Sequence, residues 1–288
     1  MPASNSYRAV GEVASFELPV AGGPAPGAIA AYKRDGVICL RGAFGRDWLD
    51  VIESGIEQAM ALHGSSAGKV TPEGGEGFFY YDSIMWKKVE PFRRFIFESH
   101  AADLFWPLLE STSLNFYYDF LLVKSAHCAG AATPWHQDHS YYPLNGTKII
   151  NCWTALDPIP SETALRFVRG SHAEGTVYRV VPFGPGLEYT NTTTDRPLPP
   201  DFDAEPDTDI VSCTMEPGDT LVWNSRTFHS APGNSLDRRR AALSTNWAGD
   251  DVTYNDMPQT SDPSERGENL VHGGPITCET FPLVRSAS

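Results

Sequence analysis

Two histidines and one aspartate have the types and the spacing to bind a metal ion. His136 and Asp138 are separated by one residue, so on an extended strand their side chains leave the same face. His229 follows 93 residues after His136 (229 − 136), which is long enough for several strands to return beside the first. Two imidazoles and one carboxylate leave other positions of a cation free, and this ligand set is typical of non-haem Fe(II) oxygenases. His172 and Glu174 form a second pair with the same spacing, so the surroundings of each pair must decide.

A cation for a dicarboxylic co-substrate follows the second histidine. An oxygenase of this kind needs two extra electrons per turnover, and 2-oxoglutarate can supply them by decarboxylation. Its 2-oxo acid end would chelate iron, and its far carboxylate would need a fixed cationic partner. Arg240 lies 11 residues after His229 (240 − 229), on a predicted returning strand. Because a guanidinium binds carboxylate through two hydrogen bonds, Arg240 is the candidate partner, whereas Arg238 and Arg239 are interpreted as surface cations.

Aromatic and polar residues flank the predicted ligands, as expected of a small-molecule pocket. The residues that could face the prime substrate are Tyr81, Trp135, Tyr141 and Arg226, together with Tyr80, Tyr142 and Asn224. For each aromatic residue the alternative is a role in the core, where most strand aromatics pack. His139 and His172 are interpreted as supporting or structural residues. His127 and Cys128 have no partners at the spacing of a zinc site.

The composition favours one domain with a large core. The 288 residues are 41% hydrophobic and 11% aromatic, which fits one elaborated domain better than two. A net charge of −14 argues against nucleic acid or an anionic membrane as the main partner. The five cysteines are scattered and without C-x-x-C spacing, which indicates reduced thiols in a cytoplasmic protein. No apolar run approaches about eighteen residues and no secretion signal is evident, so we expect a soluble cytoplasmic protein.

Helical spacing dominates the first part of the chain, after an arm rich in Ala, Gly and Pro. Residues 1–26 are expected to be loosely held. Helices are predicted over 27–34 and 46–62, with a strand over 36–42 between them. Further helical turns start at Pro91 and should break near Pro107. Residues 64–77 are rich in Gly and Ser and are expected to be mobile.

After Ser113 the pattern changes to short strands. They are predicted at 114–124, 147–156, 165–168, 209–215, 219–223 and 239–247. This order predicts an α+β fold with a mainly β core, a sandwich or closed barrel with the N-terminal helices packed outside. One domain would span 27–288, with a helical part at 27–112, the core at 113–248 and an extension at 249–288. The long segment 173–208 and the segment 64–77 could close over the site.

These motifs resemble the phytanoyl-CoA dioxygenase (PhyH) family of Fe(II)/2-oxoglutarate oxygenases, over about residues 116–251. The resemblance is carried by Lys124, the Trp-His-Gln-Asp-His segment 135–139, segments 152–157 and 165–172, Pro217-Gly218-Asp219, His229 and segment 240–244. It implies a double-stranded β-helix (jelly-roll, cupin-like) in which His136, Asp138 and His229 hold iron. It also implies that Arg240 binds the far carboxylate of 2-oxoglutarate, while Lys124 and Trp153 line the co-substrate pocket.

Two positions depart from the family pattern and one supports it. Thr163 stands where the family often has Gly, which would alter a turn. Ala231 stands where a hydroxyl residue is usual, two places after the second histidine, and its absence would remove a hydrogen bond to the co-substrate. Asp138 is informative because halogenating relatives carry Gly or Ala there. A carboxylate favours hydroxylation, or a variant such as desaturation or ring formation.

The sequence therefore predicts a dioxygenase that uses Fe(II), O₂ and 2-oxoglutarate to oxidise a small molecule, with release of succinate and CO₂. One alternative is a catalytically silent PhyH-like binding module, although lost function usually removes a metal ligand first. Another is a cupin-type metalloenzyme, such as an isomerase, that does not use 2-oxoglutarate. The breadth of the family suggests a small or medium carboxylic acid, an amino acid or a natural-product intermediate as substrate. The sequence does not determine the oligomeric state.

Overall fold

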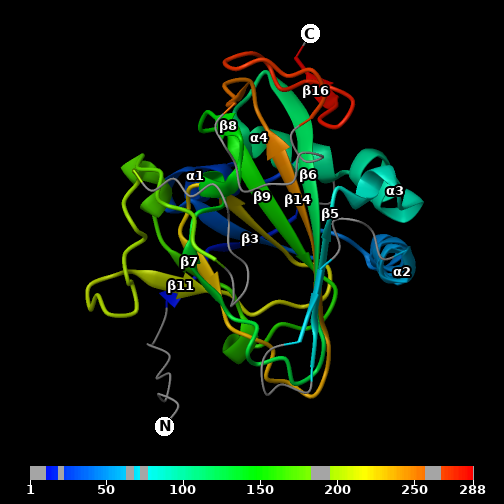
Figure 1. Ribbon diagram of the computed structural model, residues 1–288, viewed down its shortest axis with the longest axis vertical. Helices are drawn as coiled ribbons and strands as arrows, with labels where there is room; N and C mark the ends of the chain where they lie inside the picture. Colours follow the sequence, from blue (N-terminus) through cyan, green and yellow to red (C-terminus); the bar gives the residue numbers. More distant parts are fainter. Residues whose placement is uncertain are drawn as a thin grey trace.

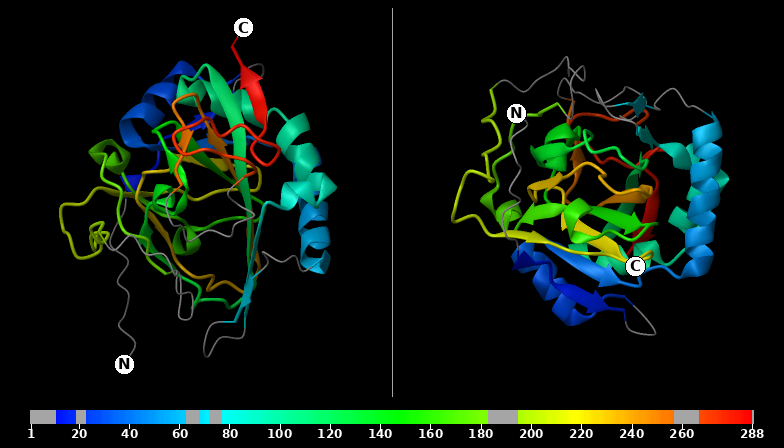
Figure 2. Two further views of the ribbon diagram at one scale, coloured as in Figure 1. Left: turned by 45° about the horizontal axis from the view of Figure 1, so that its top comes forward. Right: turned by 90° about the horizontal axis from the view of Figure 1, so that it is seen from below.

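Two β-sheets form the centre of the molecule, with the helices on the outside (Figures 1 and 2). The computed structural model describes residues 11–18, 23–62, 68–71, 77–182, 195–256 and 267–287. Helices precede a region built mainly of strands, so the predicted α+β fold with a mainly β core is confirmed.

The larger sheet has the strand order β2-β3-β12-β9-β14-β6-β5-β4, and β16 also pairs with β6. Its strands are β2 (Ser15–Glu17), β3 (Val37–Arg41), β4 (Gly68–Val70), β5 (Phe79–Ser83), β6 (Ser113–Lys124), β9 (Ile149–Ala155), β12 (Thr220–Asn224), β14 (Arg240–Ala248) and β16 (Leu283–Ser286). Every residue of β9 and of β14 is buried. Both faces of this sheet are therefore covered at its centre.

The smaller sheet has the order β1-β11-β10-β13-β7. Its strands are β1 (Gly11–Glu12), β7 (Thr133–His136), β10 (Arg166–Val168), β11 (Ile210–Ser212) and β13 (His229–Ala231), and a separate pair is formed by β8 (Leu144–Asn145) and β15 (Thr253–Tyr254). Phe167 and Val211 of the smaller sheet share one buried cluster with Trp153, Trp223 and Ala242 of the larger. The inner faces of the two sheets thus pack against each other.

Among the described residues, four α-helices cover the outer face of the larger sheet (Figure 2). They are α1 (Pro26–Asp35), α2 (Arg46–Leu62), α3 (Glu90–Glu98) and α4 (Ala101–Leu109), with short 3₁₀ turns η1 (Met85–Lys87), η2 (Asp138–Tyr141), η3 (Ser161–Thr163) and η4 (Ser171–Glu174). Ile56 of α2 and Phe92 of α3 belong to one cluster with Leu243 and Trp247 of β14. Since β14 alternates, Ala242 points the other way, into the space between the sheets.

The predicted helix break near Pro107 is wrong. Pro107 lies inside α4, and the break falls at Ser99, between α3 and α4. The Ser99 backbone is extended, and its hydroxyl donates to the carbonyl of Phe95 while accepting the amide of Ala101 at 3.2 Å. Ser99 thereby replaces backbone hydrogen bonds at both helix ends, which is the usual role of a serine there.

Segments expected to be loose contribute strands. Residues 11–12 and 15–17, within the predicted arm 1–26, pair in parallel with β11 and β3. Residues 68–70, within the segment expected to be mobile, pair with β5. Backbone hydrogen bonding to a sheet edge therefore outweighs a Gly-rich composition. The rest of the arm before residue 11, most of 64–77 and residues 183–194 lie outside the described residues.

The state of the cysteines and the length of the helices can be compared with the expected reduced thiols and the expected lack of a membrane span. All five cysteines fall within the described residues, and all are free thiols, in agreement with the absence of a disulfide framework. None of the helices in the described ranges combines the length and the apolar character that a membrane span requires.

Candidate metal centre

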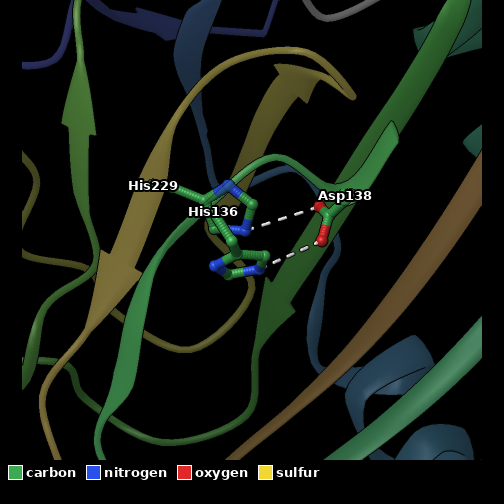
Figure 3. A group of neighbouring side chains, drawn as sticks. All are labelled: His136, Asp138 and His229. Carbon is green, nitrogen blue, oxygen red and sulfur yellow. Dashed lines mark ion pairs between the residues drawn. The ribbon is translucent and has the colours of Figure 1, made fainter. Parts of the chain in front are cut away.

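Strands β7 and β13 bring the two distant histidines side by side. His136 pairs with His229 in the antiparallel ladder, and the two ring centroids are 4.1 Å apart. Asp138 begins η2, just after β7 ends, and the extended backbone of Gln137 keeps it on the side of His136. Its Oδ1 lies 3.3 Å from Nε2 of His136 and its Oδ2 lies 3.4 Å from Nε2 of His229 (Figure 3). All three donor atoms lie within 4.8 Å of one another, so one metal ion can bind them together.

Backbone carbonyls fix the orientation of both imidazoles. Nδ1 of His136 lies 2.9 Å from the carbonyl oxygen of Pro134, and Nδ1 of His229 lies 3.1 Å from that of Thr227. A carbonyl can only accept, so each Nδ1 carries the proton and each Nε2 carries the lone pair. Both lone pairs are therefore available to the centre of the triad, as metal-bound histidines require.

Two side chains of the larger sheet hold the carboxylate of Asp138. Nε1 of Trp223 donates to Oδ2 at 3.1 Å, and Nδ2 of Asn151 donates to the same oxygen. Burial would raise the pKa of Asp138, but His229, His136 and the hydrogen bond from Trp223 outweigh it and lower the pKa to about 2. Asp138 is thus ionised at neutral pH and fixed in the orientation of a metal ligand.

Replacing Trp223 by phenylalanine is expected to weaken metal binding by about 10–100-fold, the usual effect of losing a partner of a metal ligand. The ring would still fill the cluster beside Phe167, so only the hydrogen bond to Asp138 is lost. Competition with a chelator measures the dissociation constant for Fe(II). The matched control is Trp247→Phe, which removes an indole N–H that donates to Thr245 on the helix side. Equal affinities in both variants would refute the role of Trp223.

The metal-free protein is expected to lose stability in acid because of His229. Burial lowers the pKa of His229 to about 4 from 6.5, against the opposing effect of Asp138. Between these values the unfolded chain binds a proton that the folded chain excludes. The free energy of unfolding therefore falls as the pH decreases from 6.5 to 4, by on the order of 3 kcal/mol. His139, whose pKa burial lowers to about 3, acts in the same direction.

Denaturant titrations of the metal-free protein from pH 7 to pH 4 check this dependence. His229→Gln should make the curve less steep, with the remaining slope due to His139, whereas His272→Gln, at an exposed position, should leave the slope unchanged. A wild-type free energy of unfolding that stays constant over this range would show that His229 is protonated in the folded state.

Two buried cations face each other across neighbouring strands. Arg240 of β14 pairs with Lys124 of β6, and each residue is only 5% exposed. The guanidinium of Arg240 lies 5.5 Å from the ring centroid of Trp153 and donates to the carbonyl of Pro232 at 3.1 Å. Lys124 donates to the same carbonyl at 3.1 Å and to that of Ala131 at 2.6 Å. The structure thus brings together the three residues predicted to bind the co-substrate.

This pair has an unsatisfied capacity for an anion. Neither Lys124 nor Arg240 takes part in an ion pair between described residues, and Nε of Arg240 is buried without a hydrogen-bond partner. Burial lowers the pKa of Arg240 to about 10, and burial together with Arg240 lowers the pKa of Lys124. Buried charges normally need a counter-charge, so the far carboxylate of 2-oxoglutarate fits this site.

The buried cations Lys124 and Arg240 and the triad of His136, Asp138 and His229 both adjoin the packed interior between the two sheets. Pro232, whose carbonyl both cations share, follows three residues after His229. Trp153 packs in one cluster with Trp223, which holds Asp138. Ala231, where the family has a hydroxyl residue, packs against this cluster, so the missing hydroxyl would have faced the interior.

Two of the predicted substrate residues lie on the interior side. Tyr141 places its ring 5.8 Å from that of His136, and its hydroxyl donates to the carbonyl of Val181 at 2.6 Å. Tyr81 of β5 pairs with Leu122 of β6, and its ring lies 6.0 Å from that of Phe120. By strand alternation Leu122 and Phe120 share the face of Lys124, so Tyr81 also faces inward.

Two other residues considered for the substrate, Trp135 and Tyr80, point away from the metal centre. Trp135 leaves β7 on the side opposite to His136, where its Nε1 donates to Asp203 at 3.0 Å and its ring packs 5.5 Å from Phe202. The hydroxyl of Tyr80 donates to the carbonyl of Ala59, in α2. For these two residues the structure supports the core role, not the substrate role.

The second pair, His172 and Glu174, does not gather a third donor. Nε2 of His172 lies 3.2 Å from the carbonyl of Lys33, and Glu174 accepts a hydrogen bond from Tyr178 at 2.7 Å. Within the described ranges, the group of His136, Asp138 and His229 is the one cluster of three such residues with metal-binding geometry.

The comparison with protein families decides the assignment. The model of the phytanoyl-CoA dioxygenase (PhyH) family matches residues 32–242, which is most of the chain. The chain belongs to this family. A probable phytanoyl-CoA dioxygenase of Caenorhabditis elegans is 28% identical over 132 residues. That match covers 41% of this PhyH chain and 37% of the length of the C. elegans protein.

Solved structures share the fold of this PhyH protein. The epimerase SnoN in complex with Fe³⁺, alpha-ketoglutarate and nogalamycin RO has a TM-score of 0.70 at 23% identity, over 91% of this chain and 100% of SnoN. The alpha-ketoglutarate-dependent carbocyclase SnoK gives 0.69 at 23%, over 91% and 96%. EctD from S. alaskensis, with 2-oxoglutarate and 5-hydroxyectoine, gives 0.62 at 17%, over 81% and 78%. The predicted jelly-roll fold is therefore confirmed.

Two residues of this PhyH site, Asn151 and Trp223, were not predicted from the sequence. Asn151 stands two residues before Trp153 on β9, so period-two alternation places both on the same face. Trp223 stands at the end of a strand already predicted. Alternation could have indicated the inner face for both, but only the packing of the two sheets shows that they meet Asp138.

Proposed function

We propose that the protein is an Fe(II)/2-oxoglutarate-dependent dioxygenase that oxidises a small molecule and releases succinate and CO₂. The observation that carries this proposal is the convergence of His136, Asp138 and His229, together with the buried cations Lys124 and Arg240, which form no ion pair between described residues. Membership of the PhyH family supports it. So do the iron and alpha-ketoglutarate in the SnoN complex, which shares the fold.

Each residue has a distinct role. His136 and His229 would hold the metal through Nε2 and Asp138 through a carboxylate oxygen. When bound, iron with 2-oxoglutarate and O₂ supplies the oxidising power for the reaction. Arg240 and Lys124 bind the far carboxylate of the co-substrate and so fix its position. Trp223 and Asn151 orient Asp138, and the packed aromatic residues around the triad exclude water.

The type of oxidation is proposed from Asp138. An intact carboxylate occupies the position that halogenating relatives leave open for chloride, which favours hydroxylation. SnoN is an epimerase and SnoK a carbocyclase, so this fold supports several outcomes of substrate oxidation. The finer assignment to a hydroxylase, like the cytoplasmic location, stays a prediction.

Succinate formation tests the proposal directly. Purified protein is incubated with Fe(II), ascorbate and 2-oxoglutarate, and succinate is measured in air and under nitrogen. We expect succinate only when both Fe(II) and O₂ are present. Metal binding without any turnover of 2-oxoglutarate would favour a cupin-type enzyme. Binding of neither metal nor 2-oxoglutarate would favour a silent binding module.

A further inference from the structure

A cavity of about 110 Å³ lies next to the turn that carries Asp138. His139 and Tyr142, from this turn and the residue after it, line the cavity together with Gly146, which follows β8. The rest of the wall includes Val177 and Arg196, from the long segment before β11, and Arg226, which lies between β12 and β13. A buried water needs about 10–15 Å³ on this measure. The cavity therefore accommodates a group of several non-hydrogen atoms.

Two guanidinium groups give this cavity its charge. Arg226 and Arg196 both line it, and no acidic side chain does so among the residues that the structure describes. Arg226 donates from Nη2 to the carbonyl of Gly146 at 2.9 Å, but its buried Nε has no hydrogen-bond partner. Burial lowers the pKa of both arginines, while Asp251 raises that of Arg226 and Asp195 raises that of Arg196.

The carboxylate that acts most on Arg226 is already engaged. Asp251 raises the pKa of Arg226, but its oxygens accept hydrogen bonds from the amide and hydroxyl of Thr147 at 2.8 and 2.7 Å and from the amide of Lys148 at 3.0 Å. Asp251 therefore stabilises the turn before β9, and Arg226 keeps its unsatisfied donor.

Hydrogen bonds connect the backbone segments that carry both arginines to Gln137, which stands between two of the proposed metal ligands. Gln137, between the ligands His136 and Asp138, donates to the carbonyl of Arg226 at 2.9 Å. Oε1 of Gln137 accepts a hydrogen bond from the backbone amide of Tyr178 at 3.3 Å. The next residue, Arg179, donates from its side chain to the carbonyl of Arg196 at 3.2 Å. The two segments that carry the arginines are thus held at fixed positions relative to the triad.

A second contact leads from the cavity wall to the metal ligands. The hydroxyl of Tyr142 donates to Oδ1 of Asn151 at 3.4 Å, and Asn151 donates to Asp138. A molecule with one end in the cavity would therefore lie beside the residues that orient the carboxylate ligand.

We infer that Arg226 and Arg196 bind a small oxyanionic group of the prime substrate, such as a carboxylate, and so hold its remainder at the metal centre. This inference rests on the proposed function for the identity of the ligand as substrate. It narrows the substrate to molecules that carry an acidic group. The chemistry that recognises this group is the same bidentate hydrogen bonding that suits arginine to carboxylates.

Binding of butyrate to the metal-free protein tests the inference, with butyramide as the uncharged probe of the same shape. Ligand-observed NMR measures both affinities. We expect butyrate to bind at least about 10-fold more tightly than butyramide, since hydrogen bonds to charged groups are stronger than those between neutral groups. Arg226→Gln and Arg196→Gln, each combined with Arg240→Gln so that butyrate is not held at the predicted co-substrate site, should remove this preference. Arg238→Gln, at an exposed position, should preserve it in the same background.

Two further variants keep the result decisive. The preference for butyrate should survive in Arg240→Gln, which separates this cavity from the predicted co-substrate site. Arg226→Lys should retain part of it, and thermal unfolding of each variant identifies loss of the fold. Equal binding of butyrate and butyramide, or a preference that depends on Arg240 and not on Arg226, would overturn the inference. Neither iron nor 2-oxoglutarate is used, so this result is independent of the succinate assay.

Discussion

Replacing Asp138 by alanine is expected to abolish Fe(II)-dependent succinate release. The substitution removes one of three ligands and leaves the two imidazoles without the carboxylate that faces both. Loss of a mere partner of a ligand costs about 10–100-fold in metal affinity, so loss of the ligand itself should exceed about 100-fold. The measurements are the dissociation constant for Fe(II) and the rate of succinate formation from 2-oxoglutarate.

Asp47→Ala serves as the matched control, because Asp47 is an exposed aspartate in the first turn of α2. It should retain full activity. Thermal unfolding of both variants shows whether Asp138→Ala still folds. Normal succinate release by a folded Asp138→Ala protein would remove Asp138 from the metal site and with it the proposed mechanism.

Replacing Arg240 by glutamine should raise the KM for 2-oxoglutarate by about 10–150-fold, which corresponds to the 1.5–3 kcal/mol of hydrogen bonds to a charged group. Arg240 is buried against Trp153 with an unsatisfied Nε, so its guanidinium has donor capacity for a carboxylate. Lys124 would remain as a single point charge. The dissociation constant for Fe(II) should change little, because Arg240 does not contact the triad through any hydrogen bond between described residues.

Arg239→Gln is the matched control for Arg240→Gln. Arg239 is the preceding residue but bonds to Glu53 and Asp157 instead, so its loss should affect stability and not the KM for 2-oxoglutarate. An unchanged KM in Arg240→Gln, or an equal rise in both variants, would contradict the assignment of the far carboxylate to Arg240.

The contrast between Arg239 and Arg240 shows how far periodicity could be trusted. Alternation along the strand correctly separated the two side chains. The interpretation of Arg239 as a surface cation was incomplete. This residue, just before β14, forms ion pairs with Glu53 of α2 and with Asp157, two residues after the end of β9. These partners lie 186 and 82 residues away in sequence, and no local pattern could have identified them.

The sequence by itself predicted the triad that the structure brings together, the cation proposed as partner of the co-substrate and the order of helices before strands. Each of these depends on residue type and on local period, which the chain displays directly. Only the tertiary structure decided that Asn151 and Trp223 hold Asp138, that Trp135 packs away from the site, and that Arg226 and Arg196 share a cavity. The physical reason is that these contacts join strands and turns distant in sequence, and only the packing of two sheets brings them together.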